Sequence, residues 1–119
     1  MSEFNDLVDR YIALWNETDA AKRRDLIAET FAERASYLDP MMASEGHEAI
    51  DCMVRAAQER FAGHRFRRAG SVDGHHDRIR FSWELTAGGG PVVAKGTDFA
   101  IIAGTRMTAA TGFLDQMPG

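Results

Sequence analysis

The sequence predicts an α+β fold in which helices come first and a meander of antiparallel strands follows. The chain has 119 residues, about the size of one domain, so we expect a single domain over residues 1–119. Apolar residues recur at helical spacing in the first half of the chain and alternate with polar residues in the second half. Helices followed by strands are typical of α+β proteins, whereas parallel doubly wound sheets alternate the two.

Three helices are expected before residue 64. The first has its apolar side chains on one stripe, formed by Phe4, Leu7, Val8, Tyr11, Ile12, Leu14 and Trp15. The second begins at a cap, Thr18 or Asp19. Its inward residues are Leu26, Ile27 and Phe31, and its outward residues are Lys22, Arg23 and Arg24. The third follows Gly46 and carries a stripe of Ile50, Met53, Val54, Ala57 and Phe61.

One short strand is expected between the second and third helices, at residues 35–39. Pro40 ends it and forces Asp39 toward extended geometry. Residues 41–45 are expected to form a loop. A longer strand is predicted at residues 79–85, where apolar and polar residues alternate, and further strands are predicted at residues 64–72, 92–103 and 107–114. The turn signals between them are Asp73-Gly74, Gly88-Gly89-Gly90 and Gly104.

Composition narrows the possible partners. The formal net charge is −4 and the pI is near 5.5, so nucleic acid is not an expected partner. The single cysteine, Cys52, excludes an intramolecular disulfide framework and a cysteine-rich zinc site, and fits a cytoplasmic protein. No signal peptide or membrane-spanning segment is expected. No phosphate loop, dinucleotide fingerprint or metal-ligand spacing is present, so we expect no cofactor and no metal.

Four segments carry a resemblance to a known group of proteins. They are Arg10-Tyr11 with Trp15-Asn16 and Asp19, residues 35–40, residues 46–50, and the late pair 96–99 with 112–115. With this order of elements, the chain resembles the nuclear-transport-factor-2-like (NTF2-like) superfamily, in particular its SnoaL-like polyketide cyclase and ketosteroid isomerase branch. The resemblance implies a cone, in which a curved sheet wraps around a long helix and a pocket opens at one end. It also implies a homodimer through the outer face of the sheet.

The resemblance also implies a catalytic set. Asp39 matches the general base of the steroid isomerases, Tyr11 the tyrosine that binds the substrate oxygen, and Asp98 a second, protonated oxygen-binding acid. The sequence departs from that pattern at Val54, where the isomerases have a supporting tyrosine. Tyr37 lies two residues before Asp39 and therefore on the same strand face.

The side chains suit proton transfer beside a carbonyl group. That chemistry needs a base near the acidic C–H bond and hydrogen-bond donors aimed at the oxygen that becomes negative. Asp98 is the one acid in a largely apolar strand, so burial would raise its pKa and favour the neutral donor form. Alternatively, Asp98 pairs with Arg80 or Arg106.

Asp39 and Tyr11 also have purely structural interpretations. Asp39 before Pro40 is a common turn in which the carboxylate caps nearby amides. Tyr11 lies on the buried stripe, where a ring usually packs and its hydroxyl is satisfied locally.

We expect the pocket to bind a small hydrophobic molecule. The expected substrate-binding residues are Trp15, Tyr37, Met41, Val54, Trp83, Ala100 and Phe113. A cyclase would bring a histidine into the pocket, for which His47 and His64 are candidates by position. The leading hypothesis is a cofactor-free isomerase or cyclase acting on a small apolar carbonyl compound. The alternative is a noncatalytic ligand-binding or dimerisation module of the same fold.

Overall fold

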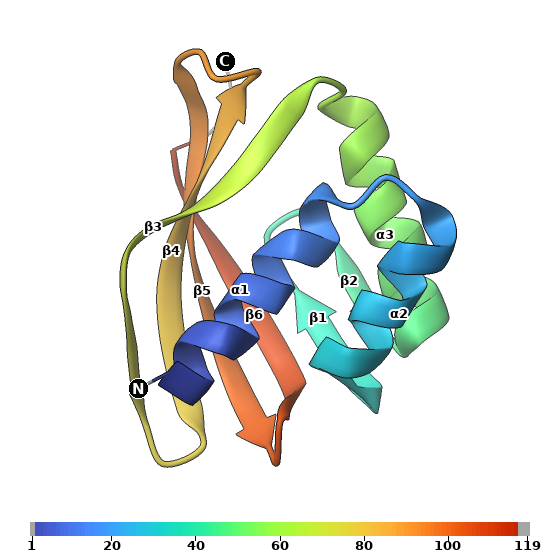
Figure 1. Ribbon diagram of the computed structural model, residues 1–119, viewed down its shortest axis with the longest axis vertical. Coiled ribbons are helices and arrows are strands. Elements are labelled where there is room, and N and C mark those ends of the chain that lie inside the picture. Colours follow the sequence, from blue (N-terminus) through green and yellow to red (C-terminus); the bar gives the residue numbers. More distant parts are fainter. Residues whose placement is uncertain (1, 117–119) are drawn as a thin grey trace.

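A computed structural model describes residues 2–116 of the chain, and three helices cover one face of a six-stranded sheet in it (Figure 1). The helices are α1 (Ser2–Asn16), α2 (Ala20–Thr30) and α3 (His47–Arg60). The strands are β1 (Phe31–Leu38), β2 (Ala43–Glu45), β3 (His64–His75), β4 (Arg78–Ala87), β5 (Val92–Ala103) and β6 (Arg106–Gln116). This arrangement confirms the expected α+β fold.

The sheet has the strand order β2-β1-β6-β5-β4-β3. Every neighbouring pair is antiparallel except β1 and β6, which are parallel, so the sheet is mostly antiparallel as predicted. The four long strands curve around α1, which runs across their concave side (Figure 1). One face of each long strand therefore points toward the helices, and the other points outward.

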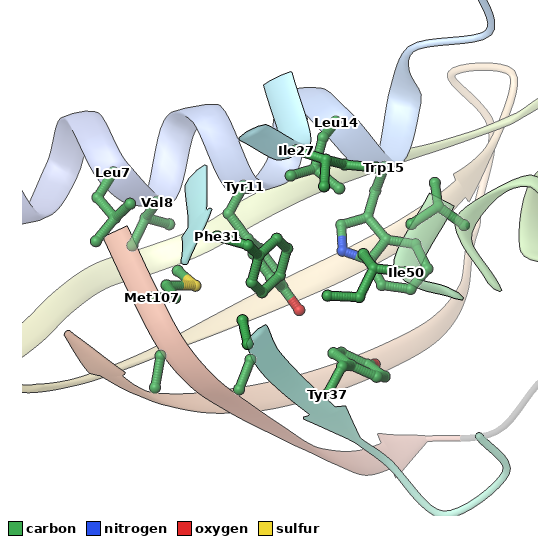
Figure 2. Packing of buried hydrophobic residues seen from close by; sticks show 14 of the residues in the cluster. Leu7, Val8, Tyr11, Leu14, Trp15, Ile27, Phe31, Tyr37, Ile50 and Met107 are labelled. Atoms are coloured by element: carbon green, nitrogen blue, oxygen red, sulfur yellow. The ribbon is translucent and has the colours of Figure 1, made fainter. Parts of the chain in front are cut away.

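The core fills the space between the helices and the concave face of the sheet. Val8 and Leu14 of α1 are completely buried there, together with Ile50 of α3 and Met107 of β6. These residues belong to one buried cluster with Phe31 from the start of β1 (Figure 2). Burial of aliphatic and aromatic side chains of this size contributes about 1.5–3 kcal/mol each.

Two predictions for the second helix were wrong. The predicted helical residue Phe31 is the first residue of β1, although it is buried as expected. Arg23 was expected to point outward, but it is 3% exposed because its Nε donates to Asp51 Oδ1 at 2.6 Å. Gln58 Oε1 also accepts a hydrogen bond from Arg23. The buried ion pair joins α2 to α3 and satisfies the charge that burial would otherwise penalise.

Strand boundaries also differ from the prediction. β1 begins at Phe31 instead of residue 35 and ends at Leu38, one residue before Asp39. Residues 43–45 form β2 instead of a loop, paired with the end of β1. β3 continues through Asp73-Gly74, and the turn to β4 follows at His76, which has a positive φ of 52°. Gly74 is required in the strand for packing: a Cβ there would lie 2.8 Å from the ring of Phe4. Within residues 2–116, no helix is long and apolar enough to cross a membrane.

Candidate functional site

The sheet register brings two carboxyl groups together on the concave face. Asp98 of β5 pairs with Phe81 of β4 on one side and with Gly112 of β6 on the other. Asp39 follows the end of β1, the strand next to β6. A Cβ on Gly112 would lie 2.9 Å from Asp98 Oδ1 and 3.3 Å from Asp39 Cβ, so both acids border the same small space. Glycine at this position leaves that space open.

A cavity of about 70 Å³ lies over this point. Its walls are mostly aromatic and aliphatic, and both acids contribute to them. The lining residues are Tyr11, Ile12, Trp15, Tyr37, Asp39, Met41, Met42, Ala57, Phe61, Phe66, Trp83, Leu85, Ala94, Asp98 and Leu114. Met41 is 47% exposed, so the cavity reaches the surface at the Met41-Met42 loop. Methionine is flexible, and these two side chains can adapt to a ligand larger than the space seen here.

Asp98 is buried at the inner end of this cavity, with 3% of its surface exposed. The Tyr11 hydroxyl donates to Asp98 Oδ2 at 2.6 Å, and Trp83 Nε1 donates to Oδ1 at 3.0 Å. Burial raises the pKa of Asp98 from 3.8 to about 6. These two hydrogen bonds favour the carboxylate and oppose that rise in pKa, whereas the charges of Asp39 and Asp115 add to it. The group can therefore gain or lose a proton near neutral pH.

Asp39 is held as a hydrogen-bond acceptor on both of its oxygens. The backbone N–H groups of Met41 and Met42 donate to Oδ1 at 2.9 and 2.8 Å, and the Tyr37 hydroxyl donates to Oδ2 at 2.6 Å. The amide contacts are those of the expected turn, in which the carboxylate caps its own loop. The contact with Tyr37 follows from the two-residue spacing along β1. Asp39 is partly exposed and lines the cavity, so it borders the cavity from the surface side.

The two phenols remain protonated donors at neutral pH. Burial raises the pKa of Tyr11 well above its usual value of 10, and the charge of Asp98 raises it further. Burial raises the pKa of Tyr37 in the same way, again with a contribution from Asp98. The Trp15 ring lies beside both phenols, with ring centroids 6.3 Å from Tyr11 and 5.7 Å from Tyr37 (Figure 2). Both hydroxyls thus point toward the carboxyl groups from rigid, buried rings.

Trp83 is fixed over a second glycine. Its ring covers Gly96, where a Cβ would lie 2.2 Å from the nearest ring atom. Trp83 and Gly96 are register partners on β4 and β5, and Phe66 of β3 packs against the other side of the indole with a centroid distance of 5.4 Å. The indole N–H is therefore held in place toward Asp98. Trp83 was expected to line the pocket, but its role as a donor to Asp98 was not predicted.

Seven of the ten predicted site residues line the cavity: Tyr11, Trp15, Tyr37, Asp39, Met41, Trp83 and Asp98. Three others do not. Val54 is fully buried in the core one turn before the lining residue Ala57, and Ala100 is fully buried between Ile79 and Ala110. Phe113 lies on the outer face of the sheet and is 60% exposed, because its neighbour Gly112 faces inward.

Several lining residues were missed: Ile12, Met42, Ala57, Phe61, Phe66, Leu85, Ala94 and Leu114. Ile12, Ala57, Phe61 and Leu85 were visible only as members of apolar patterns, which do not separate the core from a cavity wall.

The proposed arginine partners of Asp98 lie elsewhere. Arg80 pairs with Asp73 at 3.0 Å on the sheet surface, and Arg106 is exposed.

The histidines are also outside the cavity. His47 Nε2 is 2.8 Å from the carbonyl oxygen of Phe31, and His64 Nδ1 is 3.1 Å from that of Ala62. Among residues 2–116, no three His, Cys, Asp or Glu side chains are grouped so that they could hold a metal ion.

The chain matches the family model of the SnoaL-like domain over residues 8–110. A solved structure of a SnoaL-like family protein from Agrobacterium tumefaciens, described as a candidate isomerase, is 40% identical to it. That match covers 97% of this chain and 99% of the other, with a TM-score of 0.92.

Two more distant structures share the fold alone. A candidate polyketide cyclase from Sinorhizobium meliloti is 21% identical, with a TM-score of 0.69, over 90% of this chain and 93% of the other. A candidate ketosteroid isomerase from Kribbella flavida is 15% identical, with a TM-score of 0.72, over 99% of this chain and 82% of the other.

A comparison with curated proteins found no match. Since the family model spans most of the chain and the Agrobacterium protein aligns along nearly its whole length, the chain belongs to the SnoaL-like family of the NTF2-like superfamily.

Proposed function

We propose that the protein is a cofactor-free acid/base enzyme, of the isomerase or cyclase type, acting on a small and mostly apolar carbonyl compound. One observation carries the proposal. Two carboxyl groups border one small space in an apolar cavity, and the buried one has its pKa raised to about 6 beside a phenol that donates to it. Acid/base catalysis works best when the catalytic pKa lies near the operating pH.

In this proposal, Asp39 is the base and the inner end of the cavity binds the oxygen. Asp39 takes a proton from the carbon beside the carbonyl group, and the electron pair moves onto the carbonyl oxygen to give an enolate. Tyr11 and the protonated form of Asp98 donate hydrogen bonds to that oxygen. In an isomerisation, Asp39 returns the proton to another carbon. In a cyclisation, the enolate carbon attacks a second carbonyl group of the same molecule, whose C=O electron pair moves onto its oxygen, and Asp39 gives the proton to the resulting alkoxide.

Substrate binding and protonation of Asp98 are coupled. The Tyr11 hydroxyl donates to Asp98, and this hydrogen bond holds the pKa of Asp98 down. When a substrate oxygen accepts that hydroxyl instead, the carboxylate loses one of its two donors and its pKa rises. Asp98 then takes up a proton and becomes the second donor to the same oxygen.

The test is hydrogen–deuterium exchange beside the carbonyl of small ketones, followed by proton NMR in D₂O. We expect the wild type to catalyse exchange in at least one ketone of a panel, and Asp39→Asn to reduce the rate by at least 100-fold with an unchanged circular dichroism spectrum. The matched control is Asp73→Asn, because Asp73 lies on β3 outside the cavity and pairs with Arg80 at 3.0 Å on the sheet surface. Binding of ketones without exchange would favour the noncatalytic ligand-binding module instead.

We propose that two copies associate through the outer face of the sheet. Three large apolar side chains are exposed there: Leu38 at 53%, Phe99 at 38% and Phe113 at 60%. Leu38 and Phe99 both pair with Thr111 across the sheet, and Phe113 lies two residues further along β6, so all three share one face. Exposed apolar patches of this kind mark association surfaces.

A further inference from the structure

The opening of the cavity carries one positive charge beside its apolar walls. Arg60 is the last residue of α3, and its guanidinium carbon lies 5.3 Å from the centroid of the Phe61 ring. Its Nη1 is 3.9 Å from the sulfur of Met41. Phe61 and Met41 both line the cavity, and Met41 is at its surface. We call Met41, Arg60 and Phe61 the mouth of the cavity.

The arginine at the mouth is free to bind an anion. Within residues 2–116, no Asp or Glu oxygen lies within 4.0 Å of Arg60, and the Met41 sulfur is the only acceptor on its guanidinium. A sulfur acceptor is weak and is easily displaced by a carboxylate, which a guanidinium can bind through two parallel hydrogen bonds. The cation–π contact with Phe61 favours a position of the guanidinium beside the opening.

The charged side chains around the cavity differ in sign: acidic residues line the cavity, and the basic residue Arg60 lies at its mouth. Asp39 and Asp98 line it, and Asp115 is near enough that its charge also raises the pKa of Asp98. An anionic group at the inner end would lie beside the buried carboxyl group of Asp98, whereas at the mouth it would meet Arg60. A ligand with one anionic end is therefore held in a single orientation, with its uncharged oxygen inward.

We infer that Arg60 binds a carboxylate on the substrate, so that the substrate is a small oxo acid: a carbonyl group at one end, an apolar middle and a carboxylate at the other. The inference rests on the proposed function, because it assigns the inner end of the cavity to the carbonyl oxygen. It adds the chemical class of the substrate and a residue that determines specificity. Arg60 acts on binding and orientation, and takes no part in moving protons.

The test uses a matched pair of one-ring probes, 4-ethylphenol and 4-hydroxyphenylacetate, which differ only in replacing a methyl group by a carboxylate. Both carry a phenol for the oxygen site. Dissociation constants are measured by calorimetry at pH 7.5 for the wild type, Arg60→Met, Arg60→Lys and Arg55→Met. Arg60 is not itself a lining residue and reaches the opening through its contacts with Phe61 and Met41. Arg55 is the matched control, because it is an exposed arginine of the same helix that pairs with Glu59 instead.

The quantity to compare is the affinity for the acid divided by the affinity for the ethyl probe. We expect this ratio to fall about fivefold in Arg60→Met, which corresponds to an exposed ion pair, and to be unchanged in Arg55→Met. Arg60→Lys should retain part of the preference, and 0.5 M salt should reduce it in the wild type. An equal ratio in the wild type and Arg60→Met would overturn the inference, as would failure of the wild type to bind the acid.

A further variant separates this result from the proposed function. Tyr11→Phe should weaken both probes by a similar factor and leave their ratio unchanged, because Tyr11 acts on the phenol end. If Arg60→Met changes the ratio but Tyr11→Phe affects neither probe, then the mouth binds carboxylates and the oxygen site is wrong. If Tyr11→Phe weakens both probes and Arg60→Met leaves the ratio unchanged, the oxygen site stands and the oxo acid assignment fails.

Discussion

Asp98→Asn tests how strongly the fold penalises a charge at the inner end of the cavity. The variant removes the titrating group but keeps the shape of the side chain: its amide oxygen can accept from Trp83, and its amide nitrogen can donate to Tyr11. Burial raises the pKa of Asp98 from 3.8 to about 6 in the folded protein. A rise of about two pKa units corresponds to about 3 kcal/mol.

The sign of the effect follows from proton binding. Between pH 4 and pH 6 the folded protein holds a proton on Asp98 that the unfolded chain has released. Asp98 therefore makes the wild type less stable as pH rises through this interval, and its contribution levels off above about pH 7. Asp98→Asn has no such proton. The free energy of unfolding of the variant relative to the wild type should increase by about 2.4 kcal/mol between pH 4 and pH 7, because part of the full change lies below pH 4.

Urea unfolding followed by tryptophan fluorescence at pH 4, 5, 6 and 7 measures this difference. Every other titrating group is common to both proteins, so subtraction at each pH removes its contribution to first order. A difference that stays constant over the whole range would refute the argument that burial dominates at Asp98. A difference that moves in favour of the wild type with rising pH would mean that the hydrogen bonds from Tyr11 and Trp83 outweigh burial.

Three other substitutions test separate parts of the structure. Trp83→Phe removes the donor to Oδ1 and should raise the pKa of Asp98 by about one unit, seen as a shifted midpoint in the pH dependence of stability; an unmoved midpoint would contradict the contact. Gly112→Ala should abolish ligand binding and cost about 1–3 kcal/mol of stability in urea unfolding, since its Cβ would lie 2.9 Å from Asp98 Oδ1; unchanged binding would exclude this space as the ligand site. Phe113→Asp should convert a dimer to a monomer in light scattering while leaving ligand binding intact, and a variant that stays dimeric would point to a different interface.

The fold could be predicted because the sequence patterns that indicate its helices and strands involve only residues close to one another in the chain. The apolar stripe of α1 and the alternation along β4 and β5 depend only on residues near one another in the sequence. Arg23 shows where such signals fail. Its burial depends on Asp51, which is 28 residues away, and nothing in the sequence near Arg23 indicates that partner.

The site was only partly predictable, because its geometry depends on strand register. Asp98 stood out as one acid in an apolar strand. The glycines that make room beside it, Gly96 and Gly112, are ordinary strand glycines until the pairing of β4, β5 and β6 is known. The register also decides that Gly112 faces inward and Phe113 outward. The donor role of Trp83 depends on the same pairing, which places its ring over Gly96 and its N–H beside Asp98.

The central claim is that Tyr11 and Asp98 together form an oxygen-binding site, and phenol binding tests it most directly. A phenol can accept a hydrogen bond from Tyr11 while sharing its own proton with Asp98, as an enolate beside a protonated Asp98 would. In calorimetric titrations with 4-ethylphenol at pH 7, Tyr11→Phe and Asp98→Asn should each weaken binding at least tenfold, the loss expected for one hydrogen bond to a charged group in a buried site. Affinity that is the same in the wild type and both variants would contradict the account.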